Sequence, residues 1–243
     1  MSSYSYDPQS LEKHGKSFYW ASFFLPNRSK NAASELYSIC RYFDDLADET
    51  STDQSENLKN EFEQIYNNGE HPINQFFKNN NIPIQILGDL IQGLIQDQKI
   101  VRIKNEKDLI EYAYRVAGTV GLMMQPLILV NNKEANKHAV DLGIAMQLTN
   151  IARDIYEDAL MNRLYLPREW MGDITIEQLK SELFQEIQPQ MKKILKRLID
   201  LSEIYYQNGF SGMKYIPIKA RLAIFFAAKI YRAIGIKITN NTF

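Results

Sequence analysis

Two clusters of oxygen-bearing side chains stand far apart in the sequence, in segments that otherwise have an apolar helical pattern. The first contains Asp44 and Asp48, and the second contains Asn150, Asp154 and Asp158. Because an α-helix turns about 100° per residue, side chains four residues apart project from one face of a helix. Ionised carboxylates taken out of water without partners are costly, and like charges one turn apart also repel. Such rows on buried helices therefore predict a bound cation.

Magnesium is the cation that best suits these rows. Mg²⁺ prefers oxygen ligands and is typically held by a few carboxylates together with phosphate oxygens of the substrate. The five residues are therefore predicted to bind Mg²⁺ and, with it, a diphosphate. Arg41 precedes Asp44 by three residues, and Arg153 immediately precedes Asp154. The planar donor fork of arginine suits phosphate oxygens, although neutralising the neighbouring aspartates is an alternative role that can coexist with it.

The second cluster belongs to the most informative helical segment, residues 134–160. Gln147 extends its polar line by a further turn, so that polar side chains recur every three or four residues on an otherwise apolar helix. This pattern predicts a buried helix whose polar stripe faces an internal cavity. Arg163 and Tyr165 follow shortly after and offer a guanidinium and a phenol near Asp158.

Helical periodicity recurs throughout the chain and strand signals are weak, so the prediction is an all-α protein in one domain, residues 1–243. Gly118, Gly121 and Pro126 are expected to kink a helix that begins near Lys107, or to let another group approach closely. The stretch from Thr52 to Ile82 is predicted to form short helices and exposed loops. The longer helices are expected at about residues 28–49, 83–95, 134–160, 175–208 and 217–237.

Composition narrows the classes of function. A net charge of −1 provides no basic surface for nucleic acid. The one cysteine, Cys40, forms no internal disulfide, and the polar N-terminus does not resemble a signal peptide, so a cytoplasmic protein is expected. The most apolar stretch, around residues 216–236, is interrupted by lysines and arginines and is not expected to span a membrane. The sequence does not predict an oligomeric state.

Taken together, these motifs resemble the squalene/phytoene synthase family, the head-to-head prenyl synthases. The resemblance covers nearly the whole chain, and Tyr231-Arg232-Ala233-Ile234-Gly235 is most similar to bacterial phytoene synthases. The other motifs that carry it are His14-Gly15-Lys16-Ser17-Phe18, Asp44-Asp45-Leu46-Ala47-Asp48, Tyr114 to Gly121, Gln147 to Asp158 and Arg163-Leu164-Tyr165-Leu166-Pro167.

The resemblance implies a helical bundle of the isoprenoid synthase type with a central hydrophobic cavity. It implies condensation of two geranylgeranyl diphosphates to phytoene, a step of carotenoid biosynthesis, with roughly two or three Mg²⁺ ions and no NADPH. Relatives usually continue further beyond Tyr231 than this chain does. Besides the metal-binding rows, it implies that the residues contacting substrate or diphosphate are His14, Gly15, Lys16, Ser17, Tyr37, Arg41, Gln147, Arg153, Arg163, Tyr165 and Tyr231.

Two alternatives remain from the sequence. Squalene or dehydrosqualene synthesis would use the same cavity with farnesyl diphosphate, and a non-catalytic assembly or scaffold relative would use the same fold without the metal. A hydrocarbon product also makes peripheral membrane contact an expectation. The aromatic pairs Phe23-Phe24 and Phe225-Phe226 are its candidates, although such pairs are more often core residues.

Overall fold

The computed structural model describes residues 4–48, 53–181 and 184–241, and within these ranges the chain is built of helices. The only β-type pairing among them is an isolated bridge between Arg102 and Leu164. The all-α prediction is therefore confirmed. In chain order the helices are α1 (Ser10–His14), α2 (Lys16–Ser22), α3 (Asn27–Asp48), α4 (Ser55–Asn67), α5 (Pro72–Asn79), α6 (Gln85–Asp97), α7 (Glu106–Ala113), η1 (Tyr114–Gly118), α8 (Thr119–Leu127), α9 (Ala135–Arg153), α10 (Ile155–Leu160), α11 (Arg168–Met171), α12 (Ile176–Lys180), α13 (Phe184–Ser211), η2 (Gly212–Tyr215) and α14 (Ile218–Asn241).

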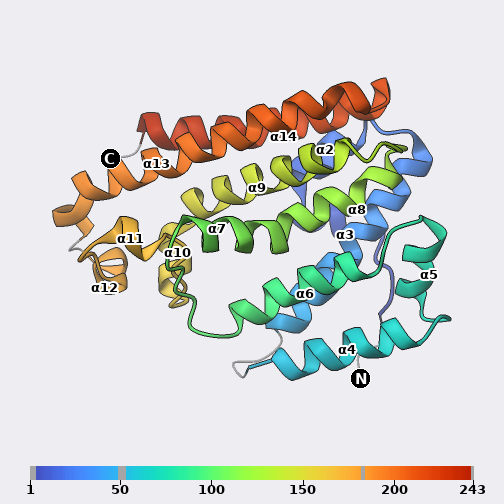
Figure 1. The fold of residues 1–243 in the computed structure, drawn as a ribbon, viewed down its shortest axis with the longest axis horizontal. Coiled ribbons are helices and arrows are strands. Elements are labelled where there is room, and N and C mark those ends of the chain that lie inside the picture. The colour runs from blue at the N-terminus through green and yellow to red at the C-terminus, as the bar shows by residue number, and fades with distance from the viewer. Residues whose placement is uncertain (1–3, 49–52, 182–183, 242–243) are drawn as a thin grey trace.

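Helix α9 lies at the centre of the bundle. It packs against α13, α14, α8 and the π-helix η1, more than any other helix does. Figure 1 shows α13 and α14 along one edge of the molecule and α4 along the opposite edge, with α9 and the α7–η1–α8 segment between them. The polar stripe of α9 is therefore enclosed by other helices, as its apolar surroundings in the sequence predicted.

Helix α3 carries the first acidic row at the edge of its buried side, with Asp44 half-buried and Asp48, at the end of the helix, exposed. Leu36, Ile39 and Phe43 are almost completely buried and form the apolar stripe that fixes the helix in the bundle. Asp44 follows Phe43 directly, so its side chain starts at the edge of that stripe. The helix ends at Asp48, close to the predicted boundary.

The second acidic row does not lie on one continuous helix, which corrects the prediction for residues 134–160. Helix α9 ends at Arg153, and Asp154 adopts φ −105° and ψ 16° before α10 begins. Aspartate is a poor residue for a helix interior, and here both carboxylate oxygens are held by the side chain of Arg153. The amide of Asp158 still donates to the carbonyl of Asp154 at 2.8 Å, so Asp158 remains one turn further on.

The glycine-rich segment allows two helices to approach closely, as predicted. A Cβ atom on Gly121 of α8 would lie 2.2 Å from the carbonyl oxygen of Ala139 in α9, and one on Gly143 of α9 would lie 2.4 Å from that of Ala117. Between α7 and α8 the helix continues through a π-helical turn, η1, of the kind often found at functional sites. Small residues at this crossing therefore set the distance between α8 and α9.

The C-terminal half contains one further difference from the prediction. The helix expected at residues 175–208 is two helices, because α12 ends at Lys180 and Ser181 adopts an extended conformation. The helix expected at 217–237 is α14, which runs to Asn241. None of the described helices is long and apolar enough to cross a membrane.

Replacing Gly121 with alanine should destabilise the fold, because the added methyl meets backbone rather than a flexible side chain. Overpacking of this kind costs about 1–3 kcal/mol, which corresponds to a fall in Tm of roughly 2–10 °C in a chain of this size. Gly69→Ala is the matched control, since a Cβ there has nothing within 4 Å. Thermal unfolding followed by circular dichroism measures both, and an unchanged Tm for Gly121→Ala would contradict the close approach.

Candidate active site

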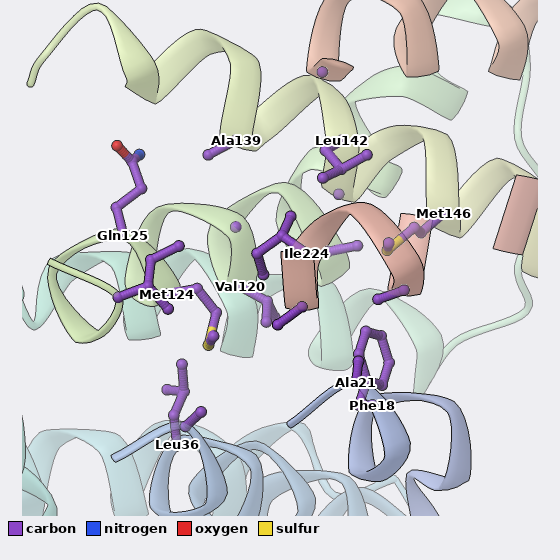
Figure 2. Close-up of a pocket in the computed structure, with 18 of the residues that line it drawn as sticks. Phe18, Ala21, Leu36, Val120, Met124, Gln125, Ala139, Leu142, Met146 and Ile224 are labelled. Atoms are coloured by element: carbon purple, nitrogen blue, oxygen red, sulfur yellow. The ribbon is translucent and has the colours of Figure 1, made fainter. Parts of the chain in front are cut away.

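A partly open, mainly apolar cavity of about 420 Å³ lies within the bundle. Its volume lies within the range usual for small-molecule sites. Figure 2 shows Val120 and Met124 of α8, Leu142 and Met146 of α9, and Ile224 of α14 around this space. The predicted central hydrophobic cavity is therefore present in the structure.

Polar side chains enter this cavity from two helices that the sequence had paired. Asp44 and Tyr37 reach it from α3, and Gln147 and Asn150 reach it from α9. The amide nitrogen of Asn150 donates to the side-chain oxygen of Gln147 at 3.3 Å, whereas the amide oxygen of Asn150 is buried without a hydrogen-bond partner. One residue of each acidic row thus lines the same apolar chamber.

One carboxyl group of each row, Asp44 in the first and Asp158 in the second, has a raised pKa. Burial raises the pKa of Asp44 to about 7, with Arg41 opposing the rise and the charges of Asp48 and Asp97 adding to it. Burial likewise raises the pKa of Asp158 to about 7, with the charges of Asp154 and Asp97 adding to it and Arg163 opposing it. Desolvation and like charge act in the same direction at both positions. A bound cation would reverse both effects.

Asp97 joins this group, and the sequence analysis did not identify it. Its carboxylate accepts hydrogen bonds from the hydroxyl of Tyr112 at 2.8 Å and the hydroxyl of Tyr165 at 3.0 Å. Burial nevertheless raises the pKa of Asp97 to about 6. Its charge raises the pKa of Asp44 in the first row and of Asp158 in the second. The negative charge of Asp97 therefore acts on carboxyl groups of both rows.

A short backbone pairing brings Tyr165 to Asp97. The amide of Leu164 donates to the carbonyl of Val101 at 3.2 Å. Tyr165 is buried, and its ring stacks on that of Tyr112 with centroids 4.7 Å apart. The signal that could have found Asp97 is its place at the last residue of the apolar helix α6, where the helix dipole favours a cation and not a carboxylate.

The three predicted arginines, Arg153, Arg41 and Arg163, each pair with an aspartate side chain. Arg153 binds Asp154 through two hydrogen bonds of 2.6 and 2.7 Å, which is the neutralising role left open by the sequence. Arg41 pairs with Asp45 at 2.5 Å, while its Nε is buried without a partner. Arg163 lies 3.7 Å from Asp48 and so connects the second motif region to the first row. At this length the contact between Arg163 and Asp48 is an ion pair without a hydrogen bond.

The remaining candidates lie around the same chamber. Tyr231 of α14 lines the cavity and packs against the ring of Phe18 with centroids 5.4 Å apart. A hydrogen bond between Tyr231 and Arg153 ties α14 to the second row. Gly15 is buried against Tyr37, where a Cβ would come within 3.1 Å of the ring. The side chains of His14, Lys16 and Ser17 lie outside the part of the chain that the structure describes.

Comparison with known proteins agrees with this arrangement. The sequence profile of the squalene/phytoene synthase family matches residues 11–243. The chain belongs to the squalene/phytoene synthase family. It is therefore an enzyme of the prenyltransferase type, in a family that uses prenyl diphosphates.

Curated relatives in this family are similar along most of their length. The chain is 31% identical to a 15-cis-phytoene synthase of Enterobacter agglomerans over 95% of this chain and 84% of the relative. It is 32% identical to a phytoene synthase of Thermus thermophilus, covering 92% of this chain and 79% of the relative.

Solved structures show the same fold. A dehydrosqualene synthase in complex with ligand superimposes with a TM-score of 0.86 at 30% identity, over 97% of this chain and 85% of that one. The squalene synthase HpnC from Alicyclobacillus acidocaldarius has a TM-score of 0.85 at 20% identity, over 96% of this chain and 92% of that one, and shows the likeness of the fold alone.

The donor set of this family member fits a hard divalent cation. Asp44 and Asn150 line the same cavity and offer a carboxylate and an amide oxygen with no partner, which are ligand types that Mg²⁺ prefers. Among the described residues no three carboxylate, histidine or cysteine side chains are already gathered at metal-binding distances. The cation would thus be bound together with an anionic group that supplies further oxygens.

Asp44→Asn should stabilise the metal-free protein at alkaline pH. The carboxyl pKa is about 4 in an unfolded chain and about 7 in the folded protein. Ionisation of Asp44 therefore costs stability that appears as pH rises above about 4 and is complete above about 7. In EDTA at pH 8 we expect a Tm higher by at least about 2 °C, with no gain at pH 4.

Asp45→Asn is the control for this measurement. Asp45 is exposed and paired with Arg41, so its neutralisation removes a weak surface ion pair and should not raise Tm at any pH. Equal Tm values for Asp44→Asn and the unaltered protein at pH 8 would contradict the burial of an uncompensated charge.

Proposed function

We propose that this enzyme condenses two geranylgeranyl diphosphates head to head to form phytoene, in a reaction that depends on Mg²⁺. The observation that carries the proposal is the apolar chamber whose wall contains Asp44 from the first row and Asn150 from the second. Such a chamber accommodates hydrocarbon chains, and its polar groups hold a diphosphate at one place on the wall.

The residues proposed to hold Mg²⁺ are Asp44 and Asp48 on α3 and Asn150, Asp154 and Asp158 at the α9–α10 junction. Their support is the raised pKa of Asp44 and Asp158 and the unpartnered oxygen of Asn150. When bound, Mg²⁺ would supply positive charge that stabilises the departing diphosphate.

The other polar residues are proposed to orient the diphosphates. Arg41 has a buried Nε without a partner, and Arg163 is held near Asp48, so both guanidinium groups can donate to phosphate oxygens. Asp97 fixes the phenols of Tyr112 and Tyr165 beside Arg163. These contacts position the leaving group relative to the chamber, which lowers the entropic part of the barrier.

The hydrocarbon chemistry then proceeds in the apolar part of the chamber. Departure of one diphosphate leaves an allylic cation, which the double bond of the second prenyl chain attacks to give a tertiary cation. Loss of a proton from the carbon that ionised then closes the ring of a cyclopropylcarbinyl diphosphate. A second ionisation, rearrangement and proton loss give phytoene. The enclosing aliphatic side chains exclude water that would capture either cation. The rings of Tyr37 and Tyr231 face this space and can stabilise positive charge by roughly 0.5–2 kcal/mol.

A second candidate uses the same site with shorter chains. The solved dehydrosqualene synthase that resembles this chain at 30% identity favours condensation of two farnesyl diphosphates. Because the polar groups would be the same, the difference between the two reactions depends on the apolar end of the chamber. The non-catalytic alternative is opposed by the presence of all four aspartates of the two rows.

Product analysis tests the proposed reaction directly. The purified protein is incubated with geranylgeranyl or farnesyl diphosphate, with Mg²⁺ or EDTA and with or without NADPH, and the hydrocarbon is extracted and identified. We expect phytoene from geranylgeranyl diphosphate with Mg²⁺ alone. Squalene or dehydrosqualene from farnesyl diphosphate would favour the second candidate, and absence of diphosphate release from either substrate would indicate a non-catalytic protein.

Single substitutions test the acidic rows. Asp44→Ala and Asp154→Ala should each reduce product formation by at least about 100-fold, because loss of one preorganised electrostatic group commonly has an effect of that size. Asp45→Asn should retain most activity, since Asp45 is exposed and faces away from the cavity. Circular dichroism confirms folding, and near-normal turnover by Asp44→Ala or Asp154→Ala would eliminate the proposed metal-binding role.

A further inference from the structure

The outer side of α2 and α14 carries an exposed aromatic surface that the proposed reaction does not use. Trp20 is 67% exposed, Phe23 53% and Phe24 47%, and on α14 Phe226 is 42% exposed. The sequence left open whether the aromatic pairs belong to the core, and the structure places them on the surface. We define the docking face by its members, which are Trp20, Phe23, Phe24, Leu222, Phe225 and Phe226.

Aromatic contacts join α2 and the residues just after it to α14 in two places. Phe24 stacks on Phe226 with centroids 5.0 Å apart, and Phe18 packs against Tyr231 with centroids 5.4 Å apart. The docking face is therefore continuous across both helices and does not consist of separate exposed side chains. Contiguous exposed apolar surface of this kind marks an interaction site.

The two segments that carry the docking face are rich in positive charge, although Glu12 lies near Tyr19 of α2 and Glu203 pairs with Arg232 of α14. Residues 14–34 and 218–241 contain eight lysines and arginines and no aspartate or glutamate, although the whole chain has a net charge of −1. Lys30 lies 4.2 Å above the ring of Phe23, and Lys229 lies 5.3 Å from the ring centre of Phe225. Lysines beside exposed aromatic rings suit the region of a bilayer where acyl chains meet anionic headgroups.

The same two helices form a wall of the cavity. Ala21 on α2, Leu25 shortly after it, and Ala223 and Ala227 on α14 line the chamber from inside. Each of these helices places a lining residue next to an exposed aromatic one that does not line the chamber, Ala21 beside Trp20 and Ala227 beside Phe226, so the wall there is one helix thick. Figure 2 shows Phe18 and Ala21 beside the α14 segment that carries Ile224. The docking face and the cavity thus lie on opposite sides of one thin wall.

We propose that the docking face binds the surface of an anionic lipid bilayer, and that long prenyl chains pass between bilayer and cavity at the α2–α14 wall. The identity of these chains rests on the proposed function, whereas lipid binding does not. A second copy of this chain is disfavoured as the occupant, because a symmetric interface would bring two positively charged faces together.

Vesicle co-sedimentation of the purified full chain, without substrate, tests the docking face. We expect binding to phosphatidylcholine vesicles that contain about a quarter phosphatidylglycerol, and much weaker binding to phosphatidylcholine alone. Trp20→Ser combined with Phe23→Ser should weaken binding at least about tenfold, although neither residue lines the cavity. Quenching of tryptophan fluorescence by brominated lipid should be lost in Trp20→Phe.

Matched charge reversals separate a local effect from net charge. Lys219→Glu with Lys229→Glu on α14 should weaken binding at least about thirtyfold, since loss of each lysine near an anionic surface weakens binding about fivefold and the introduced glutamates add repulsion. Lys59→Glu with Lys78→Glu changes net charge equally on α4 and α5, which lie away from α14 in Figure 1. That control should change binding far less.

Three results would overturn the proposal. They are absence of binding to anionic vesicles, equal losses from the two charge-reversal pairs, and lipid-free self-association that Trp20→Ser with Phe23→Ser abolishes. Turnover of detergent-dispersed substrate is measured in parallel and should be unchanged in the aromatic variant. Failure of vesicle binding with turnover intact rejects docking alone, whereas binding without turnover rejects only the proposed reaction.

Discussion

The burial of several carboxylates in one apolar bundle is the constraint on which the rest of this structure depends. Asp44, Asp97 and Asp158 each have a raised pKa because partial burial desolvates them and because a neighbouring carboxylate adds negative charge, Asp97 at Asp44 and Asp158, and Asp48 at Asp97. The protein offers only partial compensation, through Arg163 and the phenols of Tyr112 and Tyr165. Such a site is unfavourable when empty and favourable with a bound cation, which is the property that an ionisation-driven prenyl transfer requires.

The apolar chamber and the acidic rows depend on each other. Glycines at the α8–α9 crossing set the separation of these helices and so shape the chamber. The break at Asp154 lets Arg153 hold that carboxylate at the end of α9, while Asn150 remains directed into the chamber. The helix is therefore irregular at η1, next to the α8–α9 crossing, and at Asp154, next to the second acidic row. These irregular turns lower the local stability of the helix.

Helix α14 is apolar both on the side that lines the chamber and on its outer side. A helix that must be apolar toward a hydrocarbon cavity and also meets a membrane is apolar on two sides, and α14 has this character. Its lysines keep the outer side soluble and prevent the helix from resembling a membrane span. The positive sign of α2 and α14 against a slightly negative chain gives the molecule a preferred orientation toward an anionic surface.

The sequence by itself determined the all-α class, the boundaries of α3 and α14 to within a few residues, the family and the glycine crossing, because apolar periodicity and residue spacing along one helix are local properties. The placement of Asp44 and Asn150 on one cavity wall was predicted from the polar stripes and is present in the structure. Asp97 and its phenols, the exposure of the aromatic pairs and the break at Asp154 were decided only by the tertiary structure. Each depends on which segment packs beside which: the Val101–Leu164 pairing brings Tyr165 to Asp97, and nothing local to either segment encodes that contact.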